Sequence, residues 1–232
     1  MIKIIARLNK LASDIVFPPI CVNCKISIPD QKRFLCQSCF DEIILNSAFY
    51  CPKCMARLPK TSRCHDTSYI LAAASRFEPP IPSLIHTFKY KKIEGIGTIL
   101  CAMLISYLKE TGIDLSRYVI TFIPLHSSKL RARGFNQSQI LASVVSDYFS
   151  VPCLDVIKRT KNNPPQAKTK NFSERIGNIS GCFQVTNPKS ISGKNVIIID
   201  DVSTSGATLD EISTLLKKYG AERIIGLVVA KA

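Results

Sequence analysis

The sequence predicts an α/β domain, with a parallel sheet flanked by helices, that follows a small cysteine-rich module. Seven of the ten cysteines lie before residue 65, mostly in Cys-x2-Cys pairs, which are typical of structural zinc sites. From Tyr69 onwards, short β-branched runs alternate with stretches whose apolar residues recur at helical spacing, the pattern of a sheet covered by helices. We therefore expect a helix over residues 1–17, a double zinc ribbon over 18–68 and the α/β domain over 69–232.

The first 17 residues have the pattern of an amphipathic helix. Charged residues recur at helical spacing, and the opposite stripe is apolar: Ile4, Ile5, Leu8, Leu11, Ala12 and Ile15. The charges interrupt the apolar run of a signal peptide, so we expect packing on the protein body, with a membrane-surface helix as the alternative. The uncharged run Gly95–Leu108 has 14 residues, and a membrane span needs about 18 to 20. We expect no membrane span and a cytoplasmic protein.

The spacing of the first four cysteines predicts a zinc site. Two Cys-x2-Cys pairs stand eleven residues apart, and four thiolates arranged in this way can surround Zn²⁺ as a tetrahedron at about 2.3 Å. The expected ligands are Cys21, Cys24, Cys36 and Cys39. A module this small buries little apolar surface, so structural zinc has to supply on the order of 10 kcal/mol towards its folding.

A second zinc site is incomplete in the sequence. Cys51, Cys54 and Cys64 supply three thiolates, but Thr67 stands where a second Cys-x2-Cys pair would be completed. His65 is the nearest candidate for a fourth ligand, although neighbouring ligands at positions 64 and 65 are geometrically awkward. The site could also be metal-free or be closed by another residue.

The net charge of +14 is distributed unevenly. Residues 1–195 carry 15 excess positive charges, whereas residues 196–232 carry one excess negative charge. A basic body favours polyanions: nucleic acid, an anionic membrane or a phosphorylated small molecule. Basic residues of the cysteine-rich module that could grip nucleic acid, or simply keep the module soluble, are Lys25, Lys32, Arg33, Lys53, Arg57, Lys60 and Arg63.

Apolar spacing and β-branched runs define the expected elements of the α/β domain. We expect helices at 82–90, 97–109, 138–149 and 208–219, and strands at 118–123, 154–157, 196–199 and 224–230. The basic stretch Lys158–Arg175 contains two adjacent prolines and is typical of a mobile flap or a plain surface loop.

The segment after the strand at 196–199 has the features of a phosphate-binding loop. Small residues stand at a helix N-terminus, where N–H groups and the helix dipole favour a phosphate: Ser203, Thr204, Ser205, Gly206, Ala207 and Thr208. Asp200 and Asp201 would repel a bare phosphate, so we expect a neutral hydrogen-bond donor beside them. The vicinal hydroxyls of a ribose fit, with the 5′-phosphate of the sugar in the loop.

Positions 196–209 resemble the signature of the type I phosphoribosyltransferases: a hydrophobic strand, two acids and a Thr/Ser-Gly-x-Thr loop. The stretch Ile123–Gln137 is similar to the pyrophosphate-loop region of the ComF competence proteins, chiefly through RGFNQ at Arg133–Gln137. The likeness extends to Phe88–Tyr90 and to the cysteine pairs. It implies a type I phosphoribosyltransferase-like fold and binding of phosphoribosyl pyrophosphate.

The resemblance also implies a site for pyrophosphate, at Lys129, Arg131 and Arg133. Pyrophosphate carries about three negative charges, so its pocket needs cations and Mg²⁺. These residues follow a predicted strand and Pro124, on a loop that we expect at the carboxyl edge of the sheet, where open α/β sheets bind ligands. A solvated-surface role is the alternative. The chain departs from the family in the missing cysteine and in the basic run Lys168–Lys170.

Two classes of function are compatible with these features. A phosphoribosyltransferase would displace pyrophosphate from ribose C1 in favour of an acceptor that the sequence does not name; His86 and His126 are the candidate acid–base groups, and no residue stands out as catalytic. A competence protein would bind single-stranded DNA and DNA-uptake proteins, and would use the phosphoribosyl pyrophosphate site as a sensor or a retained fold. We favour the competence protein and leave turnover open.

Overall fold

A computed structural model describes residues 19–28, 34–59, 62, 64–91, 94–161 and 181–232. Its helices are α2 (Gln37–Asp41), α3 (Ile81–Lys91), α4 (Glu94–Thr111), α5 (Ser127–Arg133), α6 (Gln137–Phe149) and α8 (Ala207–Lys218). Its strands are β1 (Phe49–Tyr50), β2 (Arg57–Leu58), β3 (Ile70–Arg76), β4 (Tyr118–Phe122), β5 (Ile157–Arg159), β6 (Phe183–Val185), β7 (Asn195–Ser203) and β8 (Ile224–Lys231). The helix expected over 1–17 and most of the basic stretch 158–175 lie outside the described residues.

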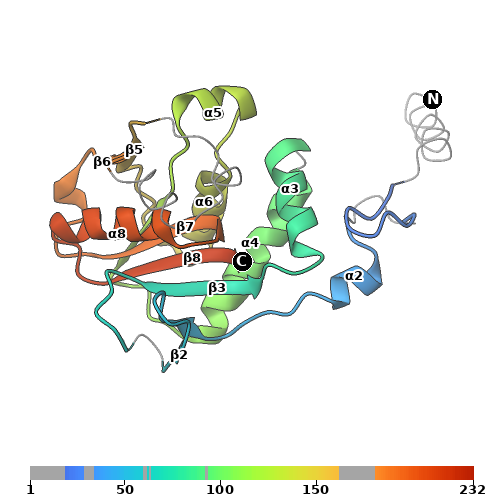
Figure 1. Ribbon diagram of the computed structural model, residues 1–232, viewed down its shortest axis with the longest axis horizontal. Helices are drawn as coiled ribbons and strands as arrows, with labels where there is room; N and C mark the ends of the chain where they lie inside the picture. Colours follow the sequence, from blue (N-terminus) through green and yellow to red (C-terminus); the bar gives the residue numbers. More distant parts are fainter. Residues whose placement is uncertain (1–18, 29–33, 60–61, 63, 92–93, 162–180) are drawn as a thin grey trace.

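A twisted sheet with helices on both faces forms the centre of the molecule (Figure 1). Its strand order is β2-β1-β3-β8-β7-β4, in which β3, β8, β7 and β4 run parallel. The predicted parallel sheet with flanking helices is therefore confirmed. The strands β1 and β2 add an antiparallel edge, so the sheet as a whole is mixed.

The central strands are buried on both faces, which explains their uninterrupted apolar runs. Along β7, Ile197 and Ile199 belong to the core on the α4 and α6 side. Val196 and Ile198 belong to a second core on the opposite side, together with Leu209 of α8. This strand carries the two acidic residues at the end of its apolar run.

Two expected segments differ from the structure. The loop expected around Lys129 is the short helix α5, so the basic residues of the predicted pyrophosphate loop project from a helix. The strand expected at 154–157 is only partly correct: β5 begins at Ile157, and the preceding residue to pair with β4 is Cys153, through an isolated bridge.

The two cysteine clusters join the α/β domain in different ways. The first packs beside α3 and α4, where Ser83 of α3 donates a hydrogen bond of 3.0 Å to Asn23 Oδ1, and the ring of Phe34 lies against Gly95. The second is continuous with the central sheet through β1 and β2. No helix in the described part of the chain is long and apolar enough to cross a membrane.

Candidate functional site

The two acids near the end of β7 are held by groups from two helices. Asp201 is 4% exposed, and its Oδ2 accepts hydrogen bonds from Gln137 Nε2 of α6 at 3.2 Å and from Lys89 Nζ of α3 at 2.9 Å. Asp200 Oδ1 accepts from Ser138 Oγ at 2.8 Å and from the backbone N–H of Asp201 at 2.9 Å. Each carboxylate therefore has one oxygen held by the protein.

The Asp200 carboxyl is more weakly acidic than a free aspartate in this arrangement. Burial, followed by repulsion from the Asp201 carboxylate, raises the pKa of Asp200 to about 7. The charge of Lys89 and the hydrogen bond from Ser138 act in the opposite direction. A ligand that donates hydrogen bonds to this carboxyl therefore meets an acceptor whose protonation changes near neutral pH.

The Arg133–Gln137 motif explains how the α6 side chains reach the acids. Gly134 ends α5 with a φ of 83°, a left-handed conformation that favours glycine. Asn136 then caps α6: its Oδ1 accepts from Ser138 N at 3.1 Å, while its Nδ2 donates to Ile123 O at 3.0 Å. The motif thus turns the chain between two helices and delivers Gln137 and Ser138 to the acid pair.

Residues 88–90 of α3 pack against this same motif. The rings of Phe88 and Phe135 lie 5.8 Å apart, and the Arg133 guanidinium lies 5.3 Å from the centre of the Tyr90 ring. Between these two contacts stands Lys89, which binds Asp201. Two of the stretches that carried the sequence resemblance, Phe88–Tyr90 and Arg133–Gln137, are therefore in direct contact.

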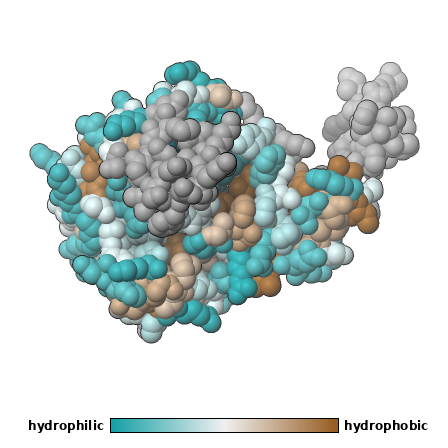
Figure 2. Space-filling model, in the orientation of Figure 1, coloured by the Kyte–Doolittle hydropathy of each residue, from teal (hydrophilic) through white to brown (hydrophobic). Residues whose placement is uncertain are grey.

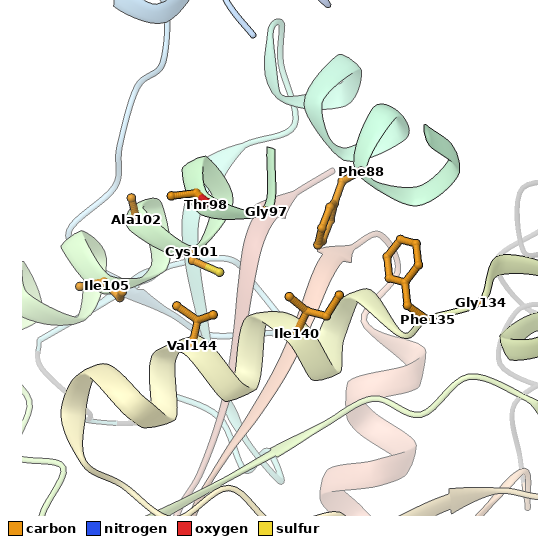
Figure 3. A pocket seen from close by; sticks show the side chains of 10 residues that line it. All are labelled: Phe88, Gly97, Thr98, Cys101, Ala102, Ile105, Gly134, Phe135, Ile140 and Val144. Carbon is orange, nitrogen blue, oxygen red and sulfur yellow. The ribbon is translucent and has the colours of Figure 1, made fainter. Parts of the chain in front are cut away.

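A cavity of about 540 Å³ lies between α3, α4 and α6. Figure 3 shows the rings of Phe88 and Phe135 at one end of it and Ile140 and Val144 of α6 along its floor. Its lining contains no charged residue, and neither acid of β7 reaches it. The cavity is thus separate from the polar site.

The loop Ser203–Thr208 surrounds a small hollow that Asp200 also lines. Gly206 caps α8 with a φ of 81°, so the loop turns directly into the positive end of a helix of 12 residues. Ser203 Oγ is buried and has no hydrogen-bond partner within the described residues. An unpaired polar atom at this position fits a loop that receives an anion.

The basic residues predicted to hold pyrophosphate lie on α5, and a further one comes from β5. Burial, followed by repulsion from Arg159 and Arg133, lowers the pKa of Lys129. Burial also lowers the pKa of Arg159, while the charge of Asp200 acts against this shift. Arg133 and Arg159 thus act electrostatically on Lys129, and Arg159 also interacts with Asp200, whereas Arg131 is exposed.

The described contacts of the two candidate acid–base histidines are with residues other than the acids. His126 Nδ1 accepts a hydrogen bond of 3.3 Å from Ser128 N and so caps α5. The ring of His86 lies 4.8 Å from that of Tyr90. Sequence reasoning missed Lys89, Gln137, Ser138 and Arg159 as site residues, although the first two belong to the stretches quoted for the resemblance.

The four cysteines of the first predicted zinc site come together. The Sγ atoms of Cys21, Cys24, Cys36 and Cys39 all lie within 4.8 Å of one another. Cys24 and Cys36 are 3.6 Å apart, and a tetrahedral zinc with sulfur at 2.3 Å requires about 3.8 Å. Although burial opposes ionisation, hydrogen bonds from neighbouring backbone N–H groups lower the pKa of Cys21 to about 6. The donor set fits structural zinc.

The second predicted site gains His65 as its fourth donor. His65 Nδ1 lies 3.4 Å from Cys51 Sγ and 3.2 Å from Cys64 Sγ, and Cys54 completes the cluster. Adjacent ligands are possible because Nδ1, unlike Nε2, stands close to the histidine backbone. Crowding by Cys51, together with burial and Cys54, raises the pKa of Cys64 to about 12. A cation is needed to ionise all three thiols together.

The two cysteine clusters have the same backbone turn after a Cys-x2-Cys pair. Lys25 and Met55, which directly follow Cys24 and Cys54, have φ values of 67° and 59°. The N–H groups of Lys25 and Met55 donate to Cys21 O and Cys51 O, at 3.0 and 2.8 Å. This repetition supports two ribbons of the same kind.

The basic residues of the cysteine-rich module that the structure describes are Lys25, Lys53 and Arg57, and all three are exposed. Lys32, Arg33, Lys60 and Arg63 lie outside the described residues. Figure 2 shows a largely hydrophilic face over the α/β domain and apolar patches at the first cysteine cluster. The exposed apolar residues of the first ribbon include Ile20, Ile26 and Phe40, which lie close to its cysteines in the sequence.

Comparison with known proteins gives two family matches. The double zinc ribbon domain matches residues 12–68, and the phosphoribosyl transferase domain matches residues 135–232. Competence protein F of Haemophilus influenzae is 27% identical over 220 residues, covering 88% of this chain and 93% of its own. The DNA utilization protein YhgH of Escherichia coli O157:H7 is 28% identical over 213 residues, covering 88% and 87%. The purine phosphoribosyltransferase of Pyrococcus horikoshii has a TM-score of 0.35 at 19% identity, covering 59% of this chain and 82% of its own.

Proposed function

This chain belongs to the ComF family, in which a double zinc ribbon precedes a phosphoribosyltransferase domain, and we propose that it binds phosphoribosyl pyrophosphate and single-stranded DNA during DNA uptake. The names of its relatives point to competence and to DNA utilization. Binding of the small ligand and of DNA is our inference from the site.

One observation carries the ligand proposal: Asp200 and the loop 203–208 line the same hollow. A carboxylate accepts hydrogen bonds from ribose hydroxyls, and the N-terminus of α8 binds the 5′-phosphate together with the buried Ser203 hydroxyl, which has no partner among the described residues. A 5-phosphorylated ribose has both groups in one molecule. A plain phosphate does not fit beside two carboxylates.

The α5 and β5 cations extend this site towards pyrophosphate. The pKa of Lys129 is lowered first by burial and then by repulsion from Arg159 and Arg133, so the positive charges of these two arginines act on the Lys129 ammonium. Pyrophosphate relieves this repulsion, and Mg²⁺ bound with the ligand offsets the remaining negative charge. The cluster therefore supports a ribose that carries pyrophosphate at C1.

Single-stranded DNA is the second partner that we propose. The exposed Lys25, Lys53 and Arg57 lie on the two ribbons, away from the small-ligand hollow. Backbone phosphates neutralise such residues with little dependence on sequence. Proteins of the DNA-uptake machinery are further expected partners.

Turnover is the alternative function, and the cation cluster is the observation that favours it. Cations that bind pyrophosphate also stabilise it as a leaving group when an acceptor attacks ribose C1. His126 Nδ1 caps α5 and His86 packs on Tyr90, and neither histidine contacts an acid in the described part of the chain. The acceptor remains unassigned.

Pyrophosphate release from phosphoribosyl pyrophosphate with Mg²⁺, measured with and without single-stranded DNA, separates these functions. Release above a heat-denatured control supports the enzyme. DNA binding by anisotropy together with calorimetric ligand binding, but no release, supports the accessory role. If calorimetry detects no binding of phosphoribosyl pyrophosphate, the proposed site is wrong.

A further inference from the structure

We propose that Lys89 is a positioning residue for the sugar site: its ammonium holds Asp201 in place and favours the charged form of the neighbouring Asp200, which is the acceptor that meets the ribose. This inference rests on the proposed function. It assigns different roles to Asp200 and Asp201, which the sequence alone does not distinguish.

One oxygen of the Asp201 carboxylate is occupied by two protein donors. Its side chain is 5% exposed, and Oδ2 receives both Lys89 Nζ at 2.9 Å and Gln137 Nε2 at 3.2 Å. Asp200 is less enclosed, and it lines the hollow of the phosphate loop, as Asp201 does not. The ribose hydroxyls therefore meet Asp200, while Asp201 links β7 to α3 and α6.

Packing on both sides of Lys89 fixes where its ammonium lies. Phe88 contacts Phe135, and Tyr90 lies under the Arg133 guanidinium, so the end of α3 is held against the Arg133–Gln137 motif. The Lys89 side chain is 25% exposed, which leaves its ammonium partly desolvated and close to its partner. A charge-assisted hydrogen bond in this setting is both strong and directional.

The charge of Lys89 matters because two carboxylates stand side by side. The groups that act on Asp200 are Asp201 on β7, Lys89 on α3, Ser138 on α6 and Arg159 on β5. Of these, Asp201 disfavours the ionised form of Asp200, and Lys89 favours it. Removal of the ammonium therefore leaves Asp200 protonated to a higher pH, and a protonated carboxyl is a poorer acceptor for two hydroxyls.

The test compares Lys89→Met, Lys89→Gln and Lys89→Arg with Lys109→Met, a control for the loss of one exposed lysine from a neighbouring helix. Calorimetry with phosphoribosyl pyrophosphate and Mg²⁺ is run between pH 5.5 and 8.5, where about a 10- to 100-fold loss of affinity is expected for Lys89→Met at pH 7. The pH midpoint of binding moves upward in Lys89→Met and Lys89→Gln. It returns towards the wild-type value in Lys89→Arg, which keeps the charge.

A ligand-free measurement makes the result independent of the proposed function. Carbon-13 spectra of labelled aspartate carboxyls follow the Asp200 titration directly in wild type and variants, with Asp200→Asn for assignment. A rise of the Asp200 midpoint in Lys89→Met and Lys89→Gln, but not in Lys89→Arg or Lys109→Met, supports the proposal even if wild type binds no ligand. An unchanged midpoint in folded Lys89→Gln overturns it, and so does wild-type affinity in that variant.

Discussion

Gly206→Ala is the sharpest test of the phosphate loop. Gly206 has a φ of 81°, and a Cβ placed there would lie 2.9 Å from the hydroxyl oxygen of Tyr69. Tyr69 is 1% exposed, so its ring cannot swing aside. The left-handed backbone costs alanine about 1 to 2 kcal/mol, and overpacking adds about 1 to 3 kcal/mol.

Gly193→Ala is a matched control. Gly193 also has a positive φ, of 68°, but a Cβ there would have no neighbour within 4 Å. This variant should therefore show the backbone cost alone. The difference in unfolding free energy between the two variants, from urea titration, then measures the collision with Tyr69. Tyr69→Phe, combined with Gly206→Ala, should recover that difference and leave the backbone cost.

The affinity for phosphoribosyl pyrophosphate should depend on the conformation of the loop 203–208 and not on the overall stability of the protein. A displaced loop loses N–H contacts to a charged phosphate, each of which is typically associated with about 1.5 to 3 kcal/mol. Calorimetry should show at least tenfold weaker binding of phosphoribosyl pyrophosphate for Gly206→Ala and wild-type affinity for Gly193→Ala. If the two glycine variants are equally stable and bind equally well, the loop does not hold the phosphate.

Three further predictions address the metals, the acids and DNA. Elemental analysis should give two zinc ions per chain. His65→Ala should lose the ion of the second ribbon, and Cys36→Ser should lose the ion and the fold of the first. Two ions in folded His65→Ala would exclude His65 as a ligand. The pKa of Asp200 rises from 3.8 to about 7 on folding, so between these pH values the folded carboxyl is protonated and the unfolded one is not. The contribution of this group to the unfolding free energy therefore falls as pH rises through this range. Asp200→Asn should flatten the pH dependence of the unfolding free energy in that range. The affinity for single-stranded DNA should fall with salt concentration. The double substitution Lys25→Gln and Arg57→Gln should reduce the slope of log affinity against log salt concentration by about 0.7 per lost phosphate contact. If these residues only aid solubility, the slope should not change.

Local patterns were sufficient for the elements that depend on burial or on ligand spacing. The apolar run of β7 and the first four cysteines were predictable because each pattern has one physical cause, a strand buried on both faces and a tetrahedral ion. The helix α5 was missed because none of its residues is buried, so no apolar spacing marks it. The strands β1 and β2 have two residues each, too few for a periodic signal.

Contacts between distant residues account for most of the remaining differences. Nothing near Lys89 in the sequence indicates that its ammonium binds Asp201, because the contact depends on α3 packing beside β7. His65 was the reverse case: the sequence suggested the residue but also an objection, which applies to a ligand bound through Nε2. The position of Nδ1 between Cys51 and Cys64 removes the objection.

The helix α3 connects the first ribbon with the acid pair of the proposed sugar site, which gives a physical reason for the two parts to affect each other. Near its start, Ser83 donates to Asn23 Oδ1, and Asn23 Nδ2 in turn donates to the sulfur of Cys39 at 3.3 Å. Near its end, Lys89 binds Asp201. If Cys39 moves when the metal is lost, the contact that holds α3 on the ribbon side is lost with it, and the opposite end of the same helix carries the lysine that binds Asp201. We therefore expect loss of zinc from the first ribbon to weaken binding of phosphoribosyl pyrophosphate, which calorimetry on zinc-depleted protein would test.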